Sequence, residues 1–188
     1  MKTTIKTLLL LTIALAGTAF TINPIERKDV KESTITWTGK KILGSHTGNI
    51  NLTSGYLEMD GEELVGGMFE VDMTSITNTD LGPDYQAKLV GHLKSGDFFA
   101  VEEFPTSTLA IKSATKKGNT YSVVANLTVK GVTEPVNFEL VMGVSAARAT
   151  VVIDRTKYDI RYGSGDFFDD LGDKTISNNF ELDVMMKF

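Results

Sequence analysis

Hydrophobic and polar residues alternate with a period of two along most of the chain. Every odd-numbered position from Tyr121 to Val129 is apolar, and three of the four positions between them are polar. Successive side chains of a β-strand point to opposite faces, so this pattern predicts strands with one apolar face. The pattern predicts strands at residues 33–38, 67–73, 121–129, 136–142 and 180–188, and shorter ones at 49–52, 56–59, 108–112 and 149–154.

Short glycine-containing turns are predicted between these strands, at residues 53–55, 60–61, 117–119 and 130–131. Such turns are typical of β-hairpins. Many short strands joined in this way predict an all-β fold, either an antiparallel sandwich or a closed barrel. Closure is favoured because it removes exposed strand edges. The alternation does not identify which face points inward.

One segment departs from the alternation. Pro83 suits the first turn of a helix over residues 84–94, in which Tyr85, Leu89 and Leu93 recur every four residues and so share one face. An aromatic pair, Phe98–Phe99, follows the helix. We expect this short helix and its aromatic exit to cap one end of the barrel.

The first 19 residues have the features of a secretory signal peptide. Lys2 and Lys6 precede an apolar run at residues 8–16, and small residues follow at 14–19. The run is short for a bilayer span, although an uncleaved anchor is the alternative. We therefore expect residues 1–19 to be removed, residues 20–188 to form one domain, and the protein to be periplasmic or secreted.

Composition removes several function classes. The chain has no cysteine, which excludes disulfides, thiolate metal sites and a cysteine nucleophile. Its net charge of −5 becomes −7 once Lys2 and Lys6 are lost, so nothing attracts nucleic acid. The sequence also lacks the glycine-rich and nucleophile motifs of the common enzyme folds.

The candidate polar sites are weak as catalytic or metal centres. His46 lies in a predicted loop at residues 44–48, His92 lies in the predicted helix, and no third ligand or base is spaced to join them. The acidic segment 166–173 does not have the ligand spacing of a calcium loop; we interpret it as a solvated loop whose Phe167–Phe168 pair anchors onto the barrel. We expect no metal, no cofactor and no catalysis.

Two further features have alternative interpretations. The adjacent Asp154 and Arg155 either form a salt bridge that closes the barrel or belong to a mouth that attracts an anionic head group. The aromatic and methionine residues either fill a solid core or line a ligand cavity, because a barrel of about eight strands can hold one small ligand.

Seven stretches resemble the YceI-like family of secreted bacterial proteins. They are Trp37-Thr38-Gly39-Lys40 and residues 44–48, 66–76, 89–99, 104–106, 127–133 and 153–158. The resemblance implies an extended antiparallel lipocalin-like β-barrel, often dimeric, that encloses a long apolar molecule such as a polyisoprenoid, an isoprenoid quinone or a fatty amide. It implies binding without catalysis.

We therefore expect an exported carrier or sequestering protein for an isoprenoid-like lipid, with a possible homodimer and transient membrane contact. The alternatives are a solid-core interaction module and an enzyme acting on the bound lipid. The expected cavity wall comprises Trp37, Phe69, Val71, Leu89, Leu93, Phe98, Phe99, Phe138, Leu140, Phe180 and Leu182. The expected head-group contacts are His92, Arg155 and Tyr158.

Overall fold

The computed structural model describes residues 24–188, so the expected signal peptide at residues 1–19 lies outside the described residues. The strands are β1 (Glu26–Asp29), β2 (Glu32–Lys41), β3 (Gly44–Asp60), β4 (Glu63–Asp72), β5 (Thr106–Lys117), β6 (Thr120–Val129), β7 (Val132–Met142), β8 (Ala146–Asp154) and β9 (Ile176–Lys187). The helices are α1 (Pro83–Lys94) and three 3₁₀ turns, η1 (Met73–Ser75), η2 (Arg155–Tyr158) and η3 (Gly172–Lys174).

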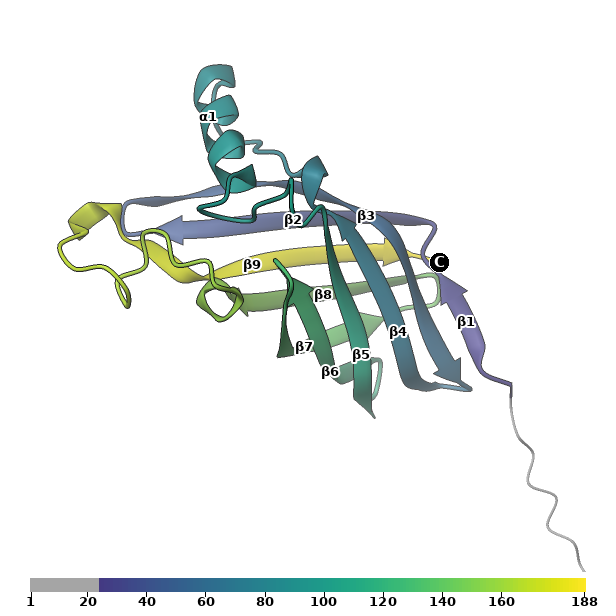
Figure 1. Ribbon diagram of the computed structural model, residues 1–188. Helices are drawn as coiled ribbons and strands as arrows, with labels where there is room; N and C mark the ends of the chain where they lie inside the picture. Colours follow the sequence, from purple (N-terminus) through teal and green to yellow (C-terminus); the bar gives the residue numbers. More distant parts are fainter. Residues whose placement is uncertain (1–23) are drawn as a thin grey trace, which may run out of the picture.

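Eight strands form a closed antiparallel barrel (Figure 1). Their order is β3-β2-β9-β8-β7-β6-β5-β4, and β4 pairs back with β3. Closure is possible because β3 is long: residues 44–50 pair with β2, and residues 51–60 pair with β4 on the other edge. The short β1 pairs with residues 56–59 of β3. The predicted barrel is confirmed.

The alternation places one apolar row of each strand inside the barrel. In β6, the buried residues are those at odd-numbered positions, from Tyr121 to Val129. Other inward residues remain partly exposed although they face the interior: Phe69, Val71, Leu109, Phe138, Phe180, Leu182 and Val184. Side chains that fill a barrel completely would be buried, so their partial exposure indicates an internal hollow.

Strand β3 corrects two sequence predictions. Residues 53–55 do not form a turn, and residues 44–48, including His46, belong to the strand rather than to a loop. The register with β4 shifts between Leu52 and Ser54, so the extra residue is absorbed as a bulge inside one continuous strand. The turn-like residues therefore mark an irregularity in the strand pairing rather than its end.

The other predicted turns are hairpins. Lys130 and Gly131 connect β6 to β7 with φ values of +52° and +75°. Positive φ at both central residues is the geometry of a type I′ turn, which matches the twist of the flanking strands. The Lys-Gly dipeptide thus fixes the register of this pair.

Helix α1 lies outside the strands, on the side where β4 ends and β5 begins (Figure 1). It starts with Pro83 at its first turn, as predicted. The three residues lie on one helix as predicted, but only the last two contact the barrel: Leu93 is buried and Leu89 packs against the core, whereas Tyr85 is 68% exposed. The helix contacts the barrel through its C-terminal half, and Phe98 and Phe99 after it are buried.

The loop between η2 and β9 is not anchored by its aromatic residues. Phe167 and Phe168 are 46% and 49% exposed, which corrects the prediction. Polar contacts hold the loop instead: the buried Ser164 hydroxyl and the Asp166 carboxylate both bond to the Asn178 amide, at 2.7 Å and 2.6 Å. The Asn178 side-chain amide, which both donates and accepts a hydrogen bond, therefore anchors the loop in place of the phenyl rings.

Candidate functional site

A cavity of about 270 Å³ lies at the end of the barrel next to α1. Its walls are mostly aliphatic and aromatic, with Trp37 and Ile50 from β2 and β3 and Leu89 and Leu93 from α1. Apolar walls with few polar groups are typical of small-molecule sites. The cavity can therefore accept an apolar chain.

A second cavity of about 90 Å³ continues further along the barrel. The residues that line both cavities are Ile35, Val71, Ser107, Leu127, Ile153 and Leu182. Because the two cavities share these six side chains, they are adjoining compartments of the barrel interior, and we call the shared residues the waist. The two compartments lie one after the other, so the apolar hollow that they make up is elongated.

The structure brings most of the sequence-predicted site residues to this hollow. The larger compartment is lined by Trp37, Val71, Leu89, His92, Leu93, Phe98, Phe99, Arg155, Phe180 and Leu182. The smaller compartment is lined by Phe69, Phe138 and Leu140, and Val71 and Leu182 reach both.

Tyr158 is the one predicted site residue that lines neither compartment. It is buried in η2, and no hydrogen-bond partner of its hydroxyl is found within the described residues. Burial, helped by the charges of Glu134 and Asp154, raises the pKa of Tyr158 to about 12. Its hydroxyl is therefore neutral at physiological pH and acts in the packing beneath the site.

Sequence analysis missed several lining residues that continue the same strand faces. Ile35, Leu127 and Ile153 lie at both compartments, each at an inward position of its strand. The alternation already contained this signal, since Ile35 shares a face with Trp37. Ser107 is harder to predict. It shares the inward face of β5 with Leu109 and Ile111, but a polar side chain would be expected on the outward face.

Arg155 is the charged group buried most deeply at the cavity. It is 2% exposed, and its guanidinium donates to the carbonyl oxygens of Ser177 (3.0 Å), Ile160 (2.7 Å) and Ile176 (3.1 Å). Burial lowers the pKa of Arg155 from its ordinary value and the charge of Asp154 opposes this. A guanidinium with an ordinary pKa of about 12 or more keeps its charge at neutral pH.

Of the two interpretations of Asp154 and Arg155, the salt bridge between them does not form. The Asp154 carboxylate accepts from the backbone N–H and the hydroxyl of Thr156, at 3.0 Å and 2.6 Å, and so caps η2. No salt bridge to Arg155 occurs among residues 24–188. Adjacent residues on an extended backbone point in opposite directions, so Asp154 and Arg155 serve different partners.

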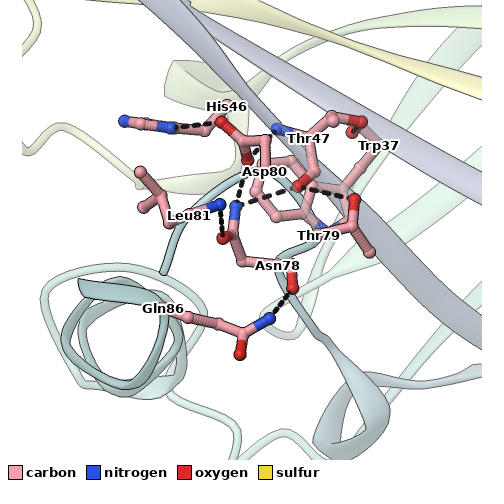
Figure 2. Close-up of polar contacts among 8 residues, drawn as sticks. All are labelled: Trp37, His46, Thr47, Asn78, Thr79, Asp80, Leu81 and Gln86. Atoms are coloured by element: carbon pink, nitrogen blue, oxygen red, sulfur yellow. Dashed lines mark hydrogen bonds and ion pairs between the residues drawn. The ribbon is translucent and has the colours of Figure 1, made fainter. Parts of the chain in front are cut away.

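A polar network attaches the segment before α1 to β3 (Figure 2). The Asp80 carboxylate accepts from the backbone N–H of Thr47 (3.0 Å) and bonds to Nδ1 of His46 (2.9 Å). The Asn78 amide donates to Thr47 O (2.9 Å), and the Gln86 side chain of α1 donates to Asn78 O. The network thereby fixes the helix against the rim of the cavity.

The same network sets the charge state of Asp80. Burial acts to raise the pKa of Asp80, but hydrogen bonds from Thr47, His46 and Asn78 outweigh it and the pKa is lowered. The carboxylate is therefore ionised at neutral pH and holds the rim.

His46 has a carboxylate partner, Asp80, and lies on the cavity wall, as a general base acting on a bound lipid would. A nucleophilic centre also needs a hydroxyl or amine bonded to the imidazole. Within the described residues, Asp80 is the one side chain hydrogen-bonded to His46, and no group of three possible metal ligands occurs.

The YceI-like domain family matches residues 27–188. The chain belongs to the YceI-like domain family. Curated relatives match more locally: a Yersinia pestis protein is 38% identical over 64 residues, and Protein YceI of Salmonella arizonae is 36% identical over 69 residues. These segments cover 34% and 36% of this chain, and the chain spans only 33% and 36% of the length of these relatives.

Solved structures with a similar fold have low sequence identity to this chain. BcnA of Burkholderia cenocepacia aligns with a TM-score of 0.64 at 18% identity, covering 82% of this chain and 94% of BcnA. A domain from Saccharophagus degradans described as polyisoprenoid binding aligns with a TM-score of 0.61 at 15% identity, covering 87% and 97%. At these identities the likeness shows the YceI-like fold alone.

In the part of the chain that the structure describes, no helix has the length and apolar character needed to cross a bilayer.

Proposed function

We propose that this YceI-like protein is a non-catalytic carrier or sequestering protein that holds a long isoprenoid-like lipid inside its barrel. The observation that carries the proposal is the elongated hollow, with its compartments of about 270 Å³ and 90 Å³. Ligand pockets typically begin at about 300 Å³, so the combined space suits one slender chain better than a bulky ring system. In a solid-core module, side chains would fill this space.

The driving force is the burial of hydrocarbon. Each buried methylene group contributes about 0.8 kcal/mol to binding. A chain of about ten methylene groups therefore contributes roughly 8 kcal/mol before the cost of association is subtracted. This interaction is not directional. Selectivity is then set by the length of the hollow and by the polar groups at its α1 end.

The family supports an isoprenoid-like chain as the first ligand class to test. The Saccharophagus degradans relative is described as a polyisoprenoid binding domain. Quinones and fatty amides have tails of the same slender form and are the other members of the proposed ligand class.

We further propose that the protein acts in the periplasm or outside the cell. The basic start and the apolar run within residues 1–19 support export. A homodimer and transient contact with a membrane stay predictions.

Trp37 provides a direct binding assay, because it is the single tryptophan of the chain and lines the larger compartment. Titration with farnesol, an isoprenoid alcohol, is expected to change the Trp37 emission saturably. Val71→Phe places a phenyl ring in the waist and is expected to weaken binding at least tenfold, because the space for the chain is filled.

Val124→Phe is the matched control, because Val124 is an exposed outward residue of β6. It is expected to bind farnesol as the wild type does. No saturable response in the wild type, or equal binding by the Val71→Phe variant, would contradict the proposed function.

A further inference from the structure

Two loops at one end of the barrel expose large apolar side chains. Ile42 and Leu43, in the turn between β2 and β3, are 61% and 66% exposed. Phe167 and Phe168, in the loop between η2 and β9, are the only exposed phenylalanines among residues 24–188. We call these four residues the apolar rim. Exposed apolar patches on a folded protein mark sites of interaction with a membrane or another protein.

The two loops of the apolar rim lie side by side (Figure 1). The backbone N–H of Ile42 donates to the carbonyl oxygen of Thr175 at 3.2 Å. Directly behind this contact, Lys41 of β2 pairs with Ile176 of β9. The turn and the loop therefore project from the same end of the barrel.

The fold holds the two phenyl rings outward. The backbone N–H groups of Phe167 and Phe168 both donate to the carbonyl oxygen of Ser164 at 3.1 Å, which closes a turn. Ser164 is itself buried and bonded to Asn178 of β9 at 2.7 Å. Because the turn is fixed from below, the rings do not fold back onto the barrel. The contact of this hydrocarbon with water is therefore built into the fold, and it is unfavourable until another apolar surface covers it.

The apolar rim adjoins the opening of the larger compartment. Lys40 and Lys41 line this compartment and are exposed to solvent, so the compartment reaches the surface beside the rim. On the other loop, the ring of Tyr162 packs edge-on against His92, a lining residue, with 4.4 Å between the ring centroids. The exposed apolar surface and the apolar interior are therefore neighbours.

The charges around the apolar rim are nearly balanced. Residues 40–43 and 159–175 together have four basic and five acidic side chains. Some of these charges neutralise one another directly, as Arg161 and Asp159 do at 2.9 Å. Electrostatic attraction to a strongly charged partner is therefore absent at this end, and burial of the apolar side chains is the driving force left for docking. A bilayer with zwitterionic head groups offers a matching surface.

The proposed cargo also favours a bilayer over a protein partner. A chain of about ten methylene groups enters water about a millionfold less readily than an apolar phase. Release through water is therefore slow, whereas an opening held against a bilayer lets the chain pass without exposure. The rim side chains also lie on two loops rather than on a flat sheet face, which suits insertion between lipid head groups.

We propose that the apolar rim inserts into the surface of a zwitterionic bilayer and holds the cavity opening against it, so that the bound lipid passes directly between membrane and barrel. This inference rests on the proposed lipid-binding function. In the docked state the four rim side chains enter the boundary between head groups and acyl chains, and the half-exposed Tyr162 lies at the level of the head groups.

The test measures the rate at which farnesol leaves the protein for vesicles of phosphatidylcholine. Loaded wild-type protein is mixed with the vesicles, and Trp37 emission returns to its unloaded value as farnesol departs. Transfer by contact predicts a rate that rises in proportion to the vesicle concentration, because collisions deliver the cargo. Transfer through water predicts a constant rate, because dissociation from the protein then limits it.

Variants locate the docking surface. Phe167→Ser combined with Phe168→Ser is expected to reduce the dependence of the rate on vesicle concentration about tenfold, and Leu43→Ser alone is expected to reduce it as well. The affinity for farnesol should not change, because none of these residues lines either compartment. Circular dichroism checks that each variant is folded.

Val144→Ser is the matched control. Val144 is fully exposed and lies in the turn between β7 and β8. This turn is at the opposite end of the barrel, since the neighbouring Ala146 pairs with Lys187 at the far end of β9 from Ile176. The control variant should transfer farnesol at the wild-type rate.

The outcomes separate the two proposals. A transfer rate that does not depend on vesicle concentration overturns the docking inference, leaves the rim for a protein partner, and leaves the proposed function standing. Equal rates in the wild type and the double phenylalanine variant also overturn it. If the rim substitutions instead convert a dimer to a monomer in sedimentation, a second copy covers the rim and the docking inference is wrong. Failure of farnesol to bind overturns the proposed function, and the docking inference with it.

Discussion

The segment before α1 lies directly against Gly48 of β3. A methyl group added there would overlap the carbonyl oxygen of Thr77 and lie 2.7 Å from its carbonyl carbon and 2.8 Å from Cα of Asn78. These are backbone atoms that cannot rotate away, so the segment must move. Three hydrogen bonds of 2.9 Å depend on its place: Thr77 N–H to Asn49 O, Trp37 Nε1 to Thr77 O, and the Asn78 amide to Thr47 O.

Gly48→Ala should therefore destabilise the protein by about 2 kcal/mol. Loss of the three hydrogen bonds costs about 3 kcal/mol at roughly 1 kcal/mol each. Alanine lowers the conformational entropy of the unfolded chain, which offsets about 0.4–1 kcal/mol of this loss. Urea unfolding measures the change in free energy, and Trp37 emission reports the broken bond to Thr77. The matched control is Gly91→Ala in α1, where the added methyl group meets open space.

The control substitution should change the free energy of unfolding in the opposite direction. Alanine is favoured over glycine in a helix by up to about 1 kcal/mol, so Gly91→Ala should leave the protein equally or more stable. If the free energy of unfolding of Gly48→Ala lies within about 0.5 kcal/mol of the wild-type value, Thr77 does not approach β3 as closely as described.

Two more predictions concern polar groups near the cavity. Tyr158→Phe should leave the stability unchanged or raise it by up to about 1 kcal/mol, because the hydroxyl it removes has no hydrogen-bond partner in residues 24–188. Tyr121→Phe should instead cost about 1 kcal/mol, because it removes a 2.6 Å hydrogen bond to Glu62 O. Urea unfolding of both variants measures these changes, and a larger loss of stability in Tyr158→Phe than in Tyr121→Phe would contradict the prediction. Asp80 has a lowered pKa in the folded state, so its stabilising effect is present above the ordinary carboxyl pKa and is lost as the pH falls through the lowered value. Asp80→Asn should accordingly be about 1 kcal/mol less stable than the wild type at pH 7 and equal to it once the wild-type carboxyl is protonated, and a difference that persists in acid would refute the assignment.

The sequence predicts the barrel well because the alternation is a local property of each strand. The apolar row from Tyr121 to Val129 is the inward row of β6, and Pro83 starts the helix as expected. Likewise, the Lys130–Gly131 turn joins two neighbouring strands. Each of these features depends on residues close together in the chain.

What the sequence does not predict depends on contacts between distant residues. Residues 53–55 are a bulge rather than a turn because β4 pairs across them. The guanidinium of Arg155 reaches carbonyls of Ile176 and Ser177, about twenty residues away, rather than its neighbour Asp154. Whether inward side chains meet or leave a hollow is also a property of the closed barrel, which no single strand reveals.

Native mass spectrometry of the protein purified from cells, without detergent or organic solvent, tests the central claim most directly. The account predicts one additional mass per barrel, released by organic extraction as a molecule with a long apolar tail and reduced in the Val71→Phe variant but not in Val124→Phe. A bare polypeptide mass, together with no Trp37 response when isoprenoids are added back, would contradict it.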